Sequence, residues 1–115
     1  MNPVPDCRCL TPPFDYRDFD SVAVGVDETG GRFGEVAIET CRLCGRRWLR
    51  YFVEYEAFSR SGRWYRGLVT DAIARAVRPG TAVDILQSLP WRFAGGDYFE
   101  STGFKSTGPV VVEPW

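Results

Sequence analysis

Two close pairs of cysteines constrain the fold of this 115-residue chain more than any other feature of its sequence. One residue separates Cys7 from Cys9, two residues separate Cys41 from Cys44, and the chain has no further cysteine and no histidine. Alternate residues of an extended segment point the same way, so even the closer pair can direct both sulfur atoms at one ion. Thiolates in such pairs suit the tetrahedral coordination of a soft divalent metal. The spacing therefore predicts a metal site, with zinc as the expected ion and iron as the alternative.

The second pair lies in a segment that is typical of a metal-binding turn. Gly45 follows Cys44, and glycine adopts positive φ without steric cost, which lets backbone N–H groups point back at the sulfur atoms. Residues 41–48 resemble the knuckle of zinc-ribbon proteins, in which the sequence C-x-x-C-G precedes a strand. The resemblance covers these residues and the presence of another cysteine pair, and it implies a structural zinc ion. The single residue between Cys7 and Cys9 departs from the ribbon pattern, so the resemblance is a poor guide to function.

Disulfide bonds, redox chemistry and burial as free thiols are the alternative roles for these cysteines. Disulfide bonds require an oxidising compartment, and residues 1–6 contain no apolar stretch of signal-peptide length. A redox C-x-x-C pair prefers the start of a helix, whereas residues 45–51 have the composition of a strand. Ordinary core cysteines are not expected to form two close pairs in one chain. A structural metal is therefore favoured, and four protein ligands leave no open coordination position for catalysis.

Length and composition predict a single soluble domain that spans residues 1–115. Hydrophobic residues make up 44% of the chain and charged residues 25%, as in ordinary globular proteins. No apolar run reaches the length that spans a bilayer, so no membrane partner is expected. Because the sequence shows no targeting segment, the cytoplasm is the expected location.

Alternating hydrophobicity predicts strands in the first part of the chain. The expected strands are residues 21–26, 33–40, 46–56 and 63–69, with short polar turns between them. In the third of these, Leu49, Tyr51 and Val53 share one face. Consecutive strands joined by short turns form an antiparallel meander.

The hydrophobic period becomes helical after the last of these strands. One short helix is expected to begin at Thr70, and a second over residues 81–89 is ended by Pro90. The prediction is an α+β fold: an antiparallel β-meander of about four strands, two short C-terminal helices and a zinc-ribbon-like metal knuckle at the end of the sheet. The aromatic residues 91–99 are expected to close the core, with the walls of a ligand pocket as the alternative, and residues 110–112 are a candidate edge strand.

Charge is distributed unevenly along the chain, although the net charge is only −1. Residues 1–40 contain three arginines and eight acidic residues, whereas residues 41–78 contain nine arginines and three acidic residues. Arginines among exposed aromatic residues suit single-stranded nucleic acid, and they also anchor protein interfaces. The candidate partner-binding residues are Arg46, Arg47, Arg50, Trp64 and Arg66. The alternative, that acidic segments at 15–39 pair with basic strands at 46–66 inside one sheet, is favoured by the overall pI of about 5.4.

The sequence contains no recognisable catalytic arrangement. Without histidine the chain lacks the usual general base near neutral pH, and the acidic residues at 15–20 are expected to form a solvated turn. The predicted function is therefore that of a small zinc-stabilised binding or accessory protein without catalytic activity. A protein partner is favoured, and nucleic-acid binding through the arginine and aromatic residues of 42–66 is the alternative.

Overall fold

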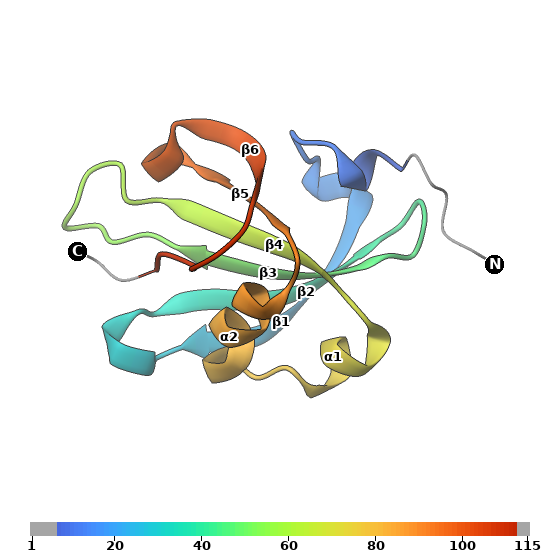
Figure 1. The fold of residues 1–115 in the computed structure, drawn as a ribbon, viewed down its shortest axis with the longest axis horizontal. Coiled ribbons are helices and arrows are strands. Elements are labelled where there is room, and N and C mark those ends of the chain that lie inside the picture. The colour runs from blue at the N-terminus through green and yellow to red at the C-terminus, as the bar shows by residue number, and fades with distance from the viewer. Residues whose placement is uncertain (1–6, 113–115) are drawn as a thin grey trace.

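The computed structural model describes residues 7–112, which form a six-stranded antiparallel sheet with its strands in sequence order (Figure 1). The strands are β1 (Phe19–Asp27), β2 (Gly34–Cys41), β3 (Arg47–Val53), β4 (Arg63–Val69), β5 (Arg92–Gly96) and β6 (Ser101–Ser106). Two short helices, α1 (Asp71–Ala76) and α2 (Ala82–Ser88), connect β4 to β5. The predicted α+β class and the antiparallel meander are confirmed. No helix in this part of the chain has the length and hydrophobicity needed to cross a membrane.

The structure corrects two features of the predicted fold in the second half of the chain. The sheet has six strands instead of about four, because β5 and β6 extend the meander. β5 contains adjacent glycines, and one of them serves packing: the Trp64 ring lies so close to Gly95 that a Cβ there would be 2.5 Å from it. The two helices precede these last strands, so they are not C-terminal.

One face of the sheet packs against α2 and the C-terminal segment. Leu49, Tyr51 and Val53 of β3 all point into this core, as their alternation predicts. The candidate edge strand at residues 110–112 is not formed. This segment has no strand pairing and instead buries its first and last side chains in the core. The Tyr65 hydroxyl holds the segment in place by donating to the Val111 carbonyl at 2.8 Å.

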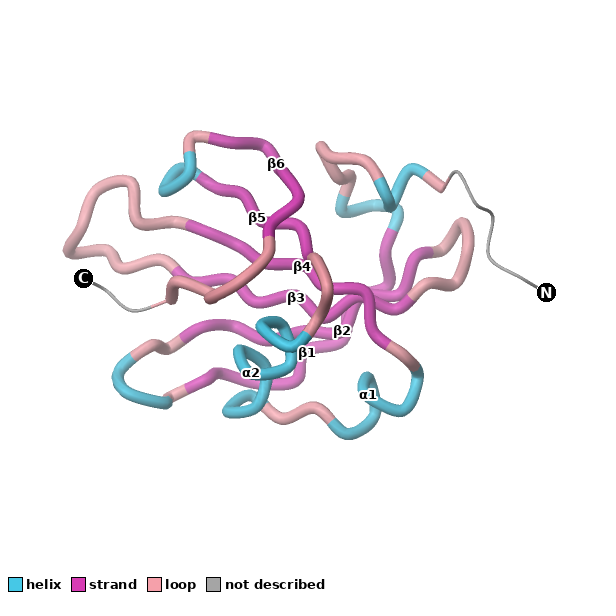
Figure 2. Tube along the Cα trace, in the orientation of Figure 1, coloured by secondary structure: helices cyan, strands magenta, loops and turns pink. Residues whose placement is uncertain are grey.

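The opposite face of the sheet is covered by residues 7–18, called here the N-terminal segment. This segment contains two 3-10 turns, Arg8–Leu10 and Tyr16–Asp18. Trp48 and Phe93 lie buried in the same cluster, with their ring centroids 5.9 Å apart. Figure 2 shows the N-terminal segment well separated from α1 and α2. The sheet therefore carries a core on each face, and the second core contains the cysteines.

A buried carboxylate lies at the end of β1. Asp27 is fully buried, and it accepts hydrogen bonds from the Tyr51 hydroxyl at 2.8 Å and from the Thr29 N–H at 3.0 Å. Burial alone raises the pKa of a carboxyl group, but these hydrogen bonds and the Arg32 guanidinium outweigh it and lower the pKa of Asp27. The folded state therefore favours the ionised form of Asp27.

We expect the substitution Tyr51→Phe to lower the free energy of unfolding by about 1–3 kcal/mol, because it leaves a buried carboxylate oxygen without its donor. Since the pKa of Asp27 is lower in the folded state, its contribution to stability is present above the ordinary carboxyl pKa and is lost as the pH falls through the folded value. Urea unfolding at about pH 7 and about pH 3 should therefore show a smaller difference between Tyr51→Phe and wild type at the lower pH. Tyr98→Phe, which removes a hydroxyl from a 45% exposed side chain, is the control and should match wild type at both values.

Candidate metal centre

The four cysteine side chains meet at one point beside the end of the sheet. All four sulfur atoms lie within 4.8 Å of one another, and both the Cys7–Cys41 and the Cys9–Cys44 Sγ–Sγ distances are 3.6 Å. A tetrahedral ion with metal–sulfur bonds of about 2.3 Å places its sulfur ligands about 3.8 Å apart. The thiols are not joined by disulfide bonds. The predicted ligand set therefore comes together at a spacing that is compatible with zinc.

The turn between β2 and β3 positions the second pair. Gly45 has a φ of 81° and donates its N–H to the Cys41 carbonyl at 2.8 Å, while the Cys41 N–H donates to the Arg46 carbonyl at 2.9 Å. The N–H groups of Leu43 and Cys44 donate to the Cys41 sulfur. Such donors stabilise thiolate charge and orient the ligands. The positive φ at the glycine is the conformation that the C-x-x-C-G sequence predicts.

The first pair reaches the cluster from a 3-10 turn, Arg8–Leu10, which contains Cys9. The extended geometry considered for both cysteines therefore holds only for Cys7, the residue that precedes the turn. The Leu10 N–H closes this turn by donating to the Cys7 carbonyl at 3.0 Å. Arg8, between the two cysteines, is largely exposed and donates two hydrogen bonds to Asp18, at 2.7 and 2.5 Å. This contact fixes the turn to the rest of the N-terminal segment while both sulfur atoms face the second pair.

The electrostatic surroundings of the four thiols are not equivalent. Burial raises the pKa of Cys9 and of Cys41. Burial acts on Cys44 in the same direction, but the backbone N–H and guanidinium of Arg46 outweigh it and lower the pKa of Cys44 to about 7. The Arg46 Nη1 atom lies 3.3 Å from the Cys44 sulfur. Four thiolates around a divalent ion carry excess negative charge, and Arg46 supplies a positive charge next to it.

Comparison with known protein families, curated proteins and solved structures finds no match to this chain. The assignment of the site therefore depends on its geometry. Four soft ligands converge from two segments that are more than thirty residues apart in the sequence, and three of the four are buried. That arrangement is suited to holding a metal ion and leaves no ligand position for a substrate.

Two of the five candidate partner-binding residues lie next to the metal centre. Arg46 contacts the sulfur of Cys44. Arg47 lies at the start of β3, and its Nε is 3.7 Å from a carboxylate oxygen of Asp71 on α1. Both arginines line a shallow depression between this turn and α1. They do not contribute to the cavity that contains the other three candidates.

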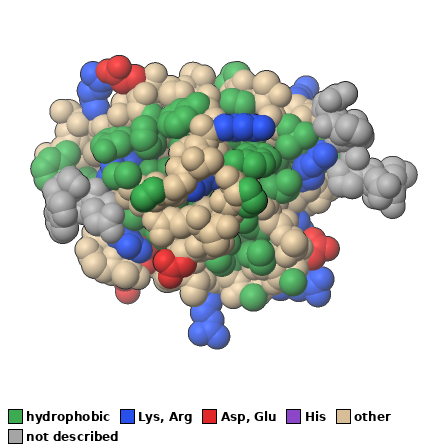
Figure 3. Space-filling model, in the orientation of Figure 1, with side chains coloured by type: hydrophobic (Ala, Val, Ile, Leu, Met, Phe, Trp, Pro, Cys, Tyr) green, Lys and Arg blue, Asp and Glu red, His purple; other side chains and the backbone are tan. Residues whose placement is uncertain are grey.

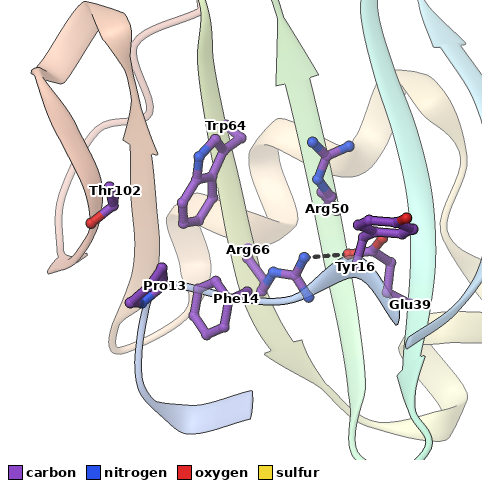
Figure 4. Close-up of a pocket in the computed structure, with 8 residues that line it drawn as sticks. All are labelled: Pro13, Phe14, Tyr16, Glu39, Arg50, Trp64, Arg66 and Thr102. Carbon is purple, nitrogen blue, oxygen red and sulfur yellow. Dashed lines mark ion pairs between the residues drawn. The ribbon is translucent and has the colours of Figure 1, made fainter. Parts of the chain in front are cut away.

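The other three candidates, Arg50, Trp64 and Arg66, line one cavity of about 440 Å³ (Figure 4). They project from β3 and β4 on the face of the sheet that the N-terminal segment partly covers. The remaining wall residues are Pro13, Phe14, Tyr16, Glu39 and Thr102. Sequence reasoning missed these five. The alternation of β2 places Glu39 on the same face as Glu35, but no pattern indicates that the N-terminal segment folds back over the sheet.

Some of the arginines that make this part of the chain basic form ion pairs with acidic residues of the same chain. The Glu39 carboxylate lies 2.5 Å from a guanidinium nitrogen of Arg66, and Asp20 lies 2.8 Å from one of Arg42. The Glu39–Arg66 contact is the pairing of residues 15–39 with residues 46–66 that the uneven charge distribution suggested as one of two alternatives, whereas Arg42 lies in the turn after β2 and outside that range. Within residues 7–112, however, no carboxylate lies within ion-pair distance of Arg50. Arg50 therefore remains a positive charge facing the cavity.

Proposed function

We propose that the four cysteines bind one zinc ion, which holds the N-terminal segment against the sheet, and that the protein is a zinc-stabilised binding protein without catalytic activity. The observation that carries this proposal is the convergence of four thiol ligands within 4.8 Å. When bound, the ion supplies structural cross-linking, since all its ligands come from the protein. Zinc is preferred to iron because it adopts the tetrahedral tetrathiolate geometry without a redox requirement.

A protein is the partner that the surface supports best. Large hydrophobic side chains are exposed around the molecule, including Tyr16 at 83%, Phe33 at 63% and Phe58 at 53%. In the view of Figure 3, hydrophobic and basic side chains lie side by side, and acidic side chains are few. Aromatic residues and arginine are the residue types that contribute most to protein interfaces. The net charge of −1 does not favour a polyanion.

Single-stranded nucleic acid is the second candidate, and the cavity is the observation that favours it. Arg50 and Trp64 project from neighbouring strands there, so Arg50 is placed to contact a phosphate and Trp64 to stack on a base. This candidate predicts that a short oligonucleotide binds with an affinity that decreases with salt, by about sevenfold between 50 and 200 mM if two phosphates are contacted. Fluorescence anisotropy with labelled oligothymidine measures this. We expect no binding below about 100 μM protein; tight, strongly salt-dependent binding would favour nucleic acid over a protein partner.

The zinc assignment is tested by elemental mass spectrometry on protein purified without chelator. We expect about one zinc ion per chain and no thiol that reacts before denaturation, because a tetrathiolate site consumes all four cysteines. Iron at the same stoichiometry would change the metal but keep the structural role. Metal-free protein with reactive thiols would contradict the proposal, and rapid alkylation would then be expected at Cys44, whose pKa Arg46 lowers to about 7.

A further inference from the structure

Two arginines face each other across neighbouring strands in the cavity. Arg50 of β3 and Arg66 of β4 are directly opposite in the antiparallel register. Like charges at directly opposite positions of a sheet repel each other. Such a pair lowers the stability of the sheet unless a negatively charged group lies beside the two side chains.

The carboxylate near the pair can neutralise only one of the two arginines. Glu39 contacts Arg66, whereas Arg50 has no carboxylate within ion-pair distance among residues 7–112. If all three groups are ionised, the cavity carries one excess positive charge. Arg50 contacts the ring of Phe52, with 5.4 Å between guanidinium and ring centroid, but an aromatic ring offers no full negative charge.

Arg66 is also short of hydrogen-bond partners. Its side chain is 7% exposed, and within the described part of the chain its Nε and Nη1 atoms have no acceptor. The Glu39 Oε1 atom, although 2.5 Å from Nη2, does not have the angles of a good hydrogen bond. Burial and the nearby charge of Arg50 lower the pKa of Arg66. A buried donor without an acceptor is costly, but these two atoms have almost no accessible surface. Arg50, which is only half-buried, is the guanidinium that an acceptor from outside the chain can reach.

Three of the remaining wall residues of the cavity, Phe14, Tyr16 and Trp64, are aromatic. Phe14 packs edge-on against Trp64, with ring centroids 5.7 Å apart. The Arg66 guanidinium is held over the rings of Phe14 and Phe19, at 4.8 and 4.3 Å from their centroids. Figure 4 shows Trp64 on one side of the two arginines and Tyr16 with Glu39 on the other. The donors are thus fixed in place by aromatic packing, which reduces the entropy lost when a ligand binds.

We propose that this cavity receives an acidic side chain of the protein partner, together with a flat apolar residue beside it. The inference rests on the proposed function as a protein-binding module and specifies the chemistry of its partner. One carboxylate neutralises the excess charge of Arg50, Arg66 and Glu39, and it supplies acceptors to the half-buried guanidinium of Arg50. The apolar neighbour packs against Trp64 and Phe14, in a space of a size that holds one or two side chains.

The test uses two capped tetrapeptides, glycine–phenylalanine–glutamate–glycine and the same sequence with glutamine, added to ¹⁵N-labelled zinc-loaded protein. Binding is followed through the side-chain N–H signals of Arg50, Arg66 and Trp64. We expect saturable shifts of these signals with the glutamate peptide, at a dissociation constant of about 1 mM. The glutamine peptide should bind at least about tenfold more weakly, since a hydrogen bond to a charged group is stronger than one between neutral groups.

The substitution Arg50→Gln should weaken binding of the glutamate peptide by about tenfold or more and leave the glutamine peptide unaffected. Arg75→Gln is the matched control, because it removes the same charge from an exposed position on α1 outside the cavity, and it should change neither affinity. Neither variant removes a buried side chain, and the metal content of each sample is measured beforehand. A failure of zinc binding is thereby recognised separately from a failure of the cavity.

Four results would overturn the inference. Equal binding of the two peptides, or insensitivity to Arg50→Gln, would show that the cavity does not select a carboxylate, while leaving a protein-binding role intact. The absence of saturable shifts with either peptide would exclude the proposed occupant of the cavity. Oligothymidine that shifts the same signals in a strongly salt-dependent way would reject both the acidic side chain and the protein partner.

Discussion

Replacement of Cys41 by serine is expected to leave most of the protein unfolded at room temperature without denaturant. Cys41 is 1% exposed and joins the N-terminal segment to the end of β2 through the metal cluster. Structural zinc in small sites contributes about 10 kcal/mol of apparent binding free energy, whereas a whole domain is stable by about 5–15 kcal/mol. A serine hydroxyl is a poor ligand for a soft ion, so most of that contribution is lost.

Circular dichroism and tryptophan fluorescence check this expectation. The fluorescence should shift toward longer wavelengths because Trp48, fully buried in the second core, becomes exposed to water. Leu43→Ala is the control, since Leu43 lies in the same turn, is 52% exposed and ligates nothing; it should stay within about 0.5 kcal/mol of wild type. Titration of wild type with a zinc chelator should reproduce the effect of Cys41→Ser. A folded serine variant with the wild-type urea midpoint would show that the cluster does not stabilise the domain.

The substitution Glu39→Gln is expected to lower the free energy of unfolding by about 3–5 kcal/mol, because it leaves Arg66 buried without a counter-charge. The Glu39 and Arg66 side chains are only 10% and 7% exposed, so water cannot replace the lost carboxylate. The change also leaves Arg50 and Arg66 opposite each other with no negative charge between them. Urea unfolding, with the slope held in common between variants, measures the difference.

Two further variants distinguish this explanation from a general sensitivity of β2. Glu35→Gln removes the same charge from an exposed position on the same face of the strand, and it should change stability by less than about 0.5 kcal/mol. The double substitution Glu39→Met with Arg66→Met should recover most of the loss, since buried ion pairs are often replaced by apolar residues at little cost. A Glu39→Gln variant as stable as wild type would show that solvent or another group already compensates Arg66.

The conformation of the turn that carries Cys41 and Cys44 could be predicted from the sequence. The conformation of the segment that carries Cys7 and Cys9 could not. The C-x-x-C-G turn depends on the φ of one glycine and on N–H groups within the turn, so its sequence determines it. Cys7 and Cys9 depend on a 3-10 turn that is joined to the rest of the N-terminal segment by the pairing of Arg8 with Asp18. One intervening residue suits either an extended or a turned backbone, so spacing alone does not decide between them.

The missed strands and the cavity depend on contacts between distant residues. β5 has glycine at two of its positions, which sequence reasoning assigns to a turn, yet Gly95 is what allows Trp64 to lie flat against the strand. The partner-binding candidates from β3 and β4 could be proposed from composition. Their separation into a cavity group and a group near the metal could not, because the N-terminal segment that forms one wall gives no periodic signal.

The N-terminal segment takes part in two sites at once, since it provides two of the four sulfur ligands and also Pro13, Phe14 and Tyr16 of the cavity wall. The two sites are therefore thermodynamically linked. Consider a molecule that binds in the cavity only when this segment is docked. The metal raises the affinity of the cavity for that molecule by some factor, and the molecule must raise the affinity of the cysteines for the metal by the same factor. Measured affinities for a partner consequently have meaning only at a stated metal occupancy. A sample with half its metal lost would show two populations of binding sites, with no change in the amino-acid sequence.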